Sequence, residues 1–118
     1  MSKSKHKRQL VVYKNYFKEF RKTLPPNALK KVYQILLYVI TLEVIPSNYL
    51  KSITSAAGLY EIRIEECGNI YRIFCCFDEG NIVILFNGFQ KKTQKTPINE
   101  IEKAKQIMKE YFDSKKGK

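Results

Sequence analysis

The chain has 118 residues, which leaves room for one domain with a modest core and excludes a second catalytic domain. Lysine and arginine total 22 against 11 acidic residues, and the net charge of +11 predicts attraction to polyanions such as nucleic acids. No apolar stretch has the length of a membrane span or the pattern of a secretory signal, so we expect a cytoplasmic protein without a membrane partner.

The termini are basic and frame one domain. Residues 1–9 are predicted to be a disordered tail, residues 10–114 the single domain, and residues 115–118 a second basic tail. The lone histidine, His6, lies in the first tail.

The first half of the domain carries the signals of one strand and two helices. A β-prone run at residues 10–13 predicts the strand, and the helical spacing of its aromatic residues predicts a helix over residues 15–22. A Pro-Pro pair then breaks the chain. An apolar stripe from Leu29 to Ile40 predicts a long amphipathic helix, which Pro46 is expected to stop.

From residue 59 the apolar period changes from helical to two. This pattern predicts strands over residues 59–65, 70–77 and 82–86, joined in an antiparallel meander. Residues 47–58 are predicted to be a polar connection. The fold class is therefore α+β, with the meander packed on the helices.

The two predicted turns, Gly68-Asn69 and Glu79-Gly80, imply a register. It places Glu65 opposite Arg72, Arg63 opposite Phe74, and Arg72 opposite Asn87. One sheet face then collects apolar side chains: Ile73, Cys75, Phe77, Ile82, Ile84 and Phe86. The other face collects charged groups and one ring: Glu61, Arg63, Arg72 and Phe74.

A loop rich in lysine and threonine, residues 88–97, follows the last predicted strand. Its Lys91, Lys92 and Lys95 lie in a stretch without acidic residues, which is typical of a phosphate-binding surface. Because Arg72 is predicted beside the end of that strand, the cations are expected to converge on one face. Thr96 and Pro97 then predict the start of a C-terminal helix, whose positive end favours a phosphate.

The cysteines predict neither a metal site nor a disulfide framework. The chain has three cysteines, Cys67, Cys75 and Cys76, which cannot all pair in disulfides and are not spaced as metal ligands. We interpret Cys75 as a small core residue. We therefore expect reduced thiols, no metal and no cofactor.

Three motifs in a fixed order carry a resemblance to a known family. They are Gly58-Leu59-Tyr60-Glu61-Ile62-Arg63, then Tyr71-Arg72-Ile73, then residues 88–97 with their Lys-Lys-Thr-Gln-Lys-Thr-Pro ending. Over most of its length the chain resembles the phage-derived HigB-like branch of the RelE/ParE toxin superfamily. The resemblance implies a RelE-like fold: an N-terminal strand and two helices, then a meander packed on the helices, and a C-terminal helix.

The same resemblance implies a function. Such a protein is the toxin of a type II toxin–antitoxin system, an mRNA interferase that enters the ribosome and cleaves mRNA by metal-independent attack of the ribose 2′-OH. Its partners would be mRNA, the ribosome and a cognate antitoxin, typically of helix-turn-helix type. A ParE-like inhibitor of DNA gyrase and a non-catalytic basic nucleic-acid-binding domain remain as alternatives.

The resemblance and the chemistry of phosphates together suggest roles for named residues. Arg63 and Arg72 would stabilise the scissile phosphate, because guanidinium groups match phosphate oxygens in pairs. Glu61 and Lys92 are the other two expected catalytic residues. The expected RNA-binding residues are the remaining cations, a hydroxyl and two rings that would stack on bases: Lys91, Lys95, Thr93, Phe74 and Phe89.

The general base stays open at this point. One candidate is Glu61, which shares the arginine face; the other is a lysine whose pKa is lowered. A glutamate paired with arginine is a weak proton acceptor, so Glu61 is equally well interpreted as an ion-pair partner that orients Arg63. Both arginines also admit a purely structural role in ion pairs across the sheet, and the lysines a role as solvated surface.

Overall fold

The computed structural model describes residues 6–93 and 95–116. Its elements, in chain order, are β1 (Gln9–Val12), α1 (Tyr16–Arg21), α2 (Pro26–Thr41), β2 (Leu50–Ser52), β3 (Tyr60–Glu66), β4 (Asn69–Asp78), β5 (Ile82–Lys91) and α3 (Ile98–Lys116). The strands form one sheet in the order β1-β5-β4-β3-β2. The α+β class and the consistency with a RelE-like fold are confirmed.

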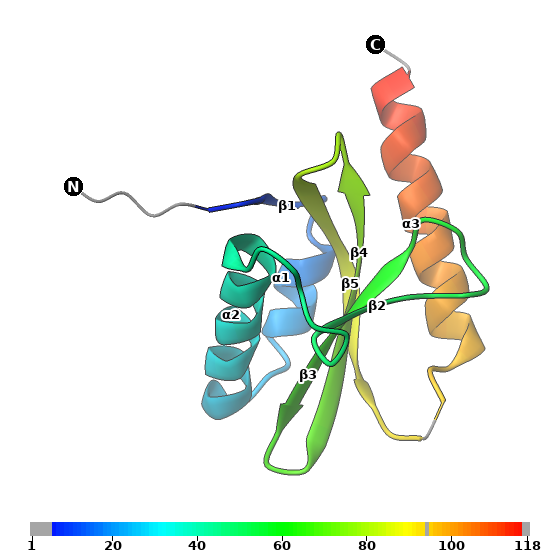
Figure 1. Ribbon diagram of the computed structural model, residues 1–118. Coiled ribbons are helices and arrows are strands. Elements are labelled where there is room, and N and C mark those ends of the chain that lie inside the picture. The colour runs from blue at the N-terminus through cyan, green and yellow to red at the C-terminus, as the bar shows by residue number, and fades with distance from the viewer. Residues whose placement is uncertain (1–5, 94, 117–118) are drawn as a thin grey trace.

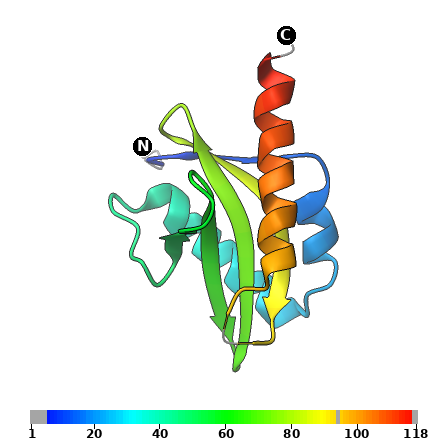
Figure 2. The same ribbon diagram turned by 90° about the vertical axis from the view of Figure 1, so that its right-hand side faces the viewer.

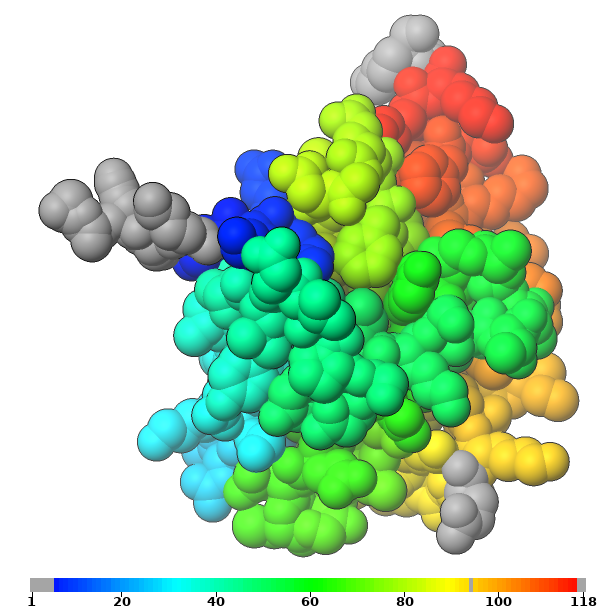
Figure 3. All heavy atoms as spheres, in the orientation of Figure 1, coloured from blue at the N-terminus to red at the C-terminus, as the bar shows by residue number. Residues whose placement is uncertain are grey.

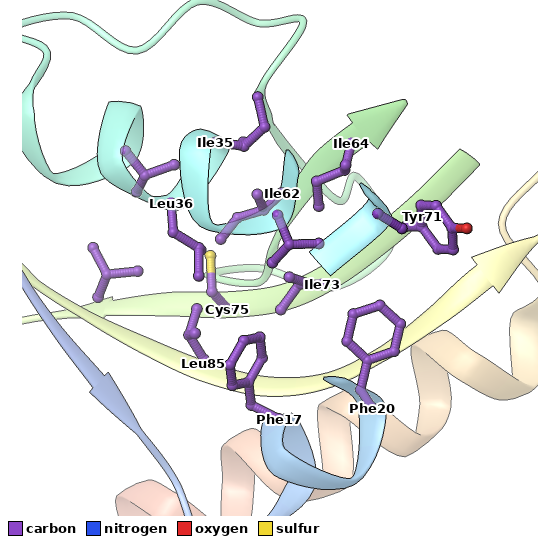
Figure 4. Close-up of a cluster of buried hydrophobic side chains, with 14 residues drawn as sticks. Phe17, Phe20, Ile35, Leu36, Ile62, Ile64, Tyr71, Ile73, Cys75 and Leu85 are labelled. Carbon is purple, nitrogen blue, oxygen red and sulfur yellow. The ribbon is translucent and has the colours of Figure 1, made fainter. Parts of the chain in front are cut away.

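The sheet is covered on both faces. Helices α1 and α2 lie on one side, and α3 lies on the other, as Figures 1 and 2 show. Figure 4 shows the first core, between the sheet and the two N-terminal helices; it includes Phe17, Phe20, Ile35, Leu36, Ile62, Ile64, Tyr71, Ile73, Cys75 and Leu85. A second core under α3 includes Phe74, Cys76, Ile84, Phe86, Ala104 and Ile107. The expectation that the helices share one face is therefore wrong.

The turn between β3 and β4 differs from the predicted one by two residues in register. Cys67 and Gly68 are the central residues, both with positive φ (52° and 79°), as a tight hairpin turn requires. Glu66 consequently pairs with Asn69, and Arg63 lies directly opposite Arg72. Because the shift is an even number of residues, every side chain of the two strands keeps its predicted face.

The turn between β4 and β5 has a larger effect. Asp78 pairs with Ile82, which is one residue away from the predicted register, and a bulge between Ile73 and Cys75 then places Arg72 opposite Phe89 instead of Asn87. A shift of one residue exchanges the two faces of a strand. The prediction that Ile82, Ile84 and Phe86 share a face with Ile73, Cys75 and Phe77 is thus wrong: these three pack in the core under α3.

Two further corrections concern the connection before the sheet. Helix α2 ends at Thr41, because the next residue, Leu42, adopts an extended conformation. Pro46 therefore does not stop the helix, as predicted, but lies beyond its end. The predicted polar connection contains β2, an edge strand that pairs with β3 and places Lys51 opposite Glu61.

Residues assigned to both predicted tails contact the rest of the domain. Arg8 donates hydrogen bonds to the carbonyls of Val39 (3.0 Å), Leu42 (2.7 Å) and Glu43 (3.0 Å), where it compensates the negative end of α2. Helix α3 extends to Lys116, and Lys115 pairs with Asp78. Residues 1–5 and 117–118 lie outside the described part of the chain. None of the described helices combines the length and the apolar character needed to cross a membrane.

Asp78 attaches the C-terminal half of α3 to the sheet. Its carboxylate accepts a hydrogen bond from the Tyr111 hydroxyl (2.6 Å) and pairs with Lys115, and these contacts, that of Lys115 first, lower the pKa of Asp78. A carboxyl group whose pKa is lower in the folded state stabilises the fold above its unfolded pKa of about 4, and this stabilisation is lost as pH falls through the folded pKa.

We therefore expect Asp78→Asn to lower the free energy of unfolding by about 1–2 kcal/mol at pH 7, because a charge-assisted hydrogen bond is weakened. Urea unfolding at pH 7 and in acid measures the difference, which should shrink in acid. Asp113→Asn is the control: Asp113 makes an exposed pair with Lys109 on the same helix, so its loss should leave the unfolding curve essentially unchanged. Equal effects of the two substitutions would contradict the role of Asp78.

Candidate nucleic-acid interface

Four cations from four strands meet on the sheet face that also carries α3. Lys51 of β2 lies opposite Glu61, Arg63 of β3 lies opposite Arg72 of β4, and Lys91 follows two residues after Phe89, the partner of Arg72. Alternation along each strand brings these side chains to one face. We call Lys51, Arg63, Arg72 and Lys91 the cationic cluster.

Glu61 lies at the centre of this cluster. Its Oε2 atom is 3.5 Å from Nε of Arg72 and 3.6 Å from Nε of Arg63, and its Oε1 accepts a hydrogen bond of 3.2 Å from the Thr96 hydroxyl. Two like charges directly opposite each other in a sheet are destabilising. The buried carboxylate offsets that repulsion and holds both guanidinium groups in place.

The two arginines differ in exposure. The Arg72 side chain is 4% exposed and that of Arg63 is 30% exposed. Nη1 of Arg72 donates to the Tyr71 carbonyl (3.1 Å), whereas its buried Nε has no hydrogen-bond partner of good geometry within the described residues. Burial lowers the pKa of Arg72, Glu61 acts in the opposite direction, and Arg63 lowers it further. Arg72 is thus a fixed, incompletely satisfied donor.

The surroundings of Lys91 lower the pKa of its ammonium group. Burial lowers its pKa most, and the positive charge of Arg72 lowers it next, while Glu61 acts in the opposite direction. Arg63 and Lys51 lower it further. An ammonium group in a field of like charge loses its proton more readily than a free lysine does.

A concavity of about 810 Å³ opens beside the cluster. It is lined by the β3–β4 turn, the ends of the central strands and the loop after β5, among them Arg63, Glu65, Arg72, Lys91, Lys92 and Thr93. In Figures 1 and 3 this turn and this loop lie at the same end of the molecule, opposite the end at which α3 finishes. The volume and the positive lining suit a stretch of phosphate backbone.

Residues 18–109 match the family described as phage-derived protein Gp49-like (DUF891), which covers more than half of the chain. The chain belongs to the Gp49-like family. This family is known as a toxin of toxin–antitoxin systems, of RelE/HigB-like type, and membership implies a cognate antitoxin as partner. No curated protein matches the sequence significantly. The whole cationic cluster lies inside the matched region.

Most of the site residues predicted for this Gp49-like chain lie together. The structure groups the charged and hydroxyl residues around the concavity: Glu61, Arg63, Arg72, Lys91, Lys92 and Thr93. Thr93 donates its hydroxyl proton to the Lys95 carbonyl (2.8 Å), which shapes the loop, and Lys92 and Lys95 are exposed. Gln94 lies outside the described residues.

The two predicted base-stacking rings do not lie on the surface. Phe74 is fully buried, Phe89 is 9% exposed, and the rings stack on each other with centroids 5.7 Å apart in the core under α3. The prediction that they stack on RNA bases is corrected. Phe74 lies on its predicted face of β4, and β5 extends far enough to include Phe89, but α3 covers this part of the face and buries both rings.

Two residues of the Gp49-like site escaped prediction. Lys51 belongs to β2, whose three residues are too few to show an alternating pattern. Thr96 was interpreted only as a helix start, whereas its hydroxyl bonds to Glu61. In the described part of the chain, groups of three or more His, Cys, Asp or Glu side chains suited to a metal do not occur.

Proposed function

We propose that this Gp49-like toxin is a HigB-type mRNA interferase, a ribosome-dependent endoribonuclease that arrests translation. The observation that supports the proposal most is the convergence of Arg63, Arg72 and Lys91 on one face beside a concavity large enough for an RNA backbone. Fixed cations stabilise the charge that develops on a phosphate during transesterification, and this electrostatic term is usually the largest in such catalysis.

In the proposed reaction, the ribose 2′-oxygen attacks the adjacent phosphorus. A bond forms between O2′ and phosphorus, the bond from phosphorus to O5′ breaks, and the products are a 2′,3′-cyclic phosphate and a 5′-hydroxyl. Arg63 and Arg72 stabilise the pentacovalent phosphorane, and Lys92 protonates the leaving O5′. Lys95 and Lys51 hold flanking phosphates.

The geometry favours Lys91 over Glu61 as general base. Both oxygens of Glu61 are engaged, one by the two guanidinium groups and the other by Thr96, so this carboxylate positions the arginines. Lys91 combines a lowered pKa with a position in the lining of the concavity. Its neutral amine would take the 2′-OH proton.

We expect Lys91→Met to reduce the cleavage rate by about 10²–10⁴-fold, the usual contribution of a general base. The wild-type rate should rise with pH as the Lys91 amine loses its proton, and the variant should lose this rise. Single-turnover cleavage measured across pH provides the test. Lys95→Met, which removes an exposed charge from the same loop, should weaken RNA binding but keep the pH profile; a pH profile that survives in Lys91→Met would exclude this base.

The function itself is tested in a reconstituted translation system with purified protein. Primer extension on the mRNA should reveal new 5′ ends that appear only when ribosomes translate. No new 5′ ends, together with inhibited DNA supercoiling, would replace the nuclease with a gyrase inhibitor. Binding to RNA without any cut would indicate a non-catalytic nucleic-acid-binding protein.

A further inference from the structure

Half of the outer edge of β5 is open. The strand runs from Ile82 to Lys91, but β1 pairs with it only from Ile82 to Leu85. The last contact of this ladder is the hydrogen bond from the Tyr13 amide to the Leu85 carbonyl (3.1 Å). Within the described residues, no strand pairs with the outer side of β5 beyond that point. An open strand edge is a template for an added strand.

The register identifies the groups that face outwards. The Leu85 carbonyl points to β1, and Leu85 is paired with Cys75. Alternate residue pairs of an antiparallel ladder have the same orientation, so the next such pairs are Ile73 with Gly88 and Tyr71 with Gln90. The amide and carbonyl groups of Gly88 and Gln90 therefore point away from β4, towards the open edge.

A groove of about 450 Å³ lies along this edge. It is bounded by α1 on one side and by Lys103 of α3 on the other, with residues 87–90 of β5 between them. In Figure 2, α1 (blue) lies to the right of α3 (orange), with the sheet behind α3. The ring of Phe20 packs on Gly88, so close that a Cβ atom there would lie 2.6 Å from it. The groove thus runs along an unpaired strand edge, which an extended chain can join through backbone hydrogen bonds.

Asn87 provides a second, independent indication of a ligand. The residue is only 4% exposed and lines the groove, and neither Nδ2 nor Oδ1 of its carboxamide has a hydrogen-bond partner within the described residues. A buried polar group left unpaired is destabilising. The carboxamide offers one donor and one acceptor side by side, which complements the C=O and N–H of a peptide group.

We propose that an extended, acidic segment of the antitoxin adds to the sheet here, as a strand that continues the line of β1 along Gly88 to Gln90 and pairs a peptide group with Asn87. A strand satisfies both the open edge and the carboxamide, because its free N–H and C=O groups pair with each. The net charge of +11 favours an acidic segment. The proposal rests on the toxin role of the family and not on RNA cleavage.

The direction of β5 gives this strand a consequence for the site. Beyond Gln90 the chain continues to Lys91 and Lys92, which line the concavity of the candidate interface. Acidic residues at the end of the added strand beside Gln90 would therefore reach the cations that we assign to RNA. One segment thus binds the toxin through its backbone and blocks the site through its side chains.

Hydrogen exchange of the complex tests the docking site. The probe is the protein encoded next to this chain whose co-expression suppresses its growth arrest, purified as a complex with the full toxin. We expect the amides of Gly88 and Gln90 to exchange quickly in the free toxin and at least tenfold more slowly in the complex.

Two substitutions give a matched pair. Gln90→Pro removes only an amide that points outwards, a position at which a strand tolerates proline, and should weaken antitoxin binding at least tenfold. Gln90→Ala removes the same side chain and keeps the amide, so the affinity should stay within about threefold. Asn87→Leu should also weaken binding at least tenfold, while the melting temperature is maintained or rises because an unpaired buried amide is removed.

Unchanged exchange at residues 87–90 in the complex, or equal affinities of Gln90→Pro and Gln90→Ala, would overturn the proposal. Protection of the same amides in the free toxin at high concentration would assign the edge to a second copy of the chain and overturn the antitoxin as occupant. If the amides of residues 87–90 are protected in the complex but the toxin cleaves no RNA, the docking site is supported and only the nuclease function is rejected.

Discussion

Replacing Arg72 with alanine should abolish growth arrest and reduce mRNA cleavage by at least about 10²–10³-fold, the loss typical when one preorganised donor to a developing oxyanion is removed. The Arg72 side chain is fixed by burial and by its ion pair with Glu61, and it lines the concavity, so its positive charge acts on a bound phosphate without reorganisation. Arg72→Lys should recover only part of the rate, because an ammonium keeps the charge but loses the paired geometry.

The measurement combines survival after induction with single-turnover cleavage in the reconstituted system. Lys30→Ala is the control: this lysine is exposed on α2 and is not part of the lining of the concavity, and its removal changes the net charge equally. We expect Arg72→Ala to fold, because Glu61 keeps its pair with Arg63. Circular dichroism and the melting temperature check this. Full toxicity of a folded Arg72→Ala would assign Arg72 to the scaffold alone.

The placement of the two arginines on one face could be predicted because it depends only on parity along β3 and β4. The real turn at Cys67-Gly68 moved the register by two residues, which changed the partner of Arg72 from Glu65 to Arg63 but kept the face. In physical terms, the alternation of buried Ile62 and Ile64 with polar neighbours determines the face, whatever turn is chosen.

Which side chains of β5 face α3 could not be predicted in the same way. Its residues 82–86 are all apolar and the sheet is covered on both sides, so alternation carries no signal about which residues face α3. The register then depends on one turn residue and one bulge. Phe74 and Phe89 were assigned to RNA for a different reason: the sequence does not show that α3 packs on their face, where both belong to the core.

The core under α3 and the cationic cluster share one sheet face, which connects stability to the site. Thr96, immediately before α3, donates its hydroxyl proton to Glu61, so the start of the helix and the arginines are held by the same carboxylate. Glu61 is therefore expected to contribute to the fold and to the proposed chemistry at once. The two contributions are separable by comparing substitutions on the two sides of the ion pair.

Glu61→Gln should lower the free energy of unfolding by about 3–5 kcal/mol, more than Arg72→Met does, because it leaves two guanidinium groups facing each other without a counter-charge. Arg72→Met leaves Glu61 still paired with Arg63. Urea unfolding of both single variants and of the double variant measures the coupling between the residues, which for a contacting pair is about 0.5–3 kcal/mol.

Glu65→Gln is the matched control, because this glutamate is exposed on the same strand and should matter by less than about 0.5 kcal/mol. If the proposed reaction holds and Glu61 only positions the arginines, the folded Glu61→Gln variant should cleave slowly but keep the wild-type pH dependence, since the proposed proton acceptor, Lys91, is untouched. A pH dependence lost in Glu61→Gln and kept in Lys91→Met would reverse the two roles and make the carboxylate the base. Glu61 and Lys91 are thus distinguished by their pH profiles rather than by the size of the loss, because either substitution slows the reaction.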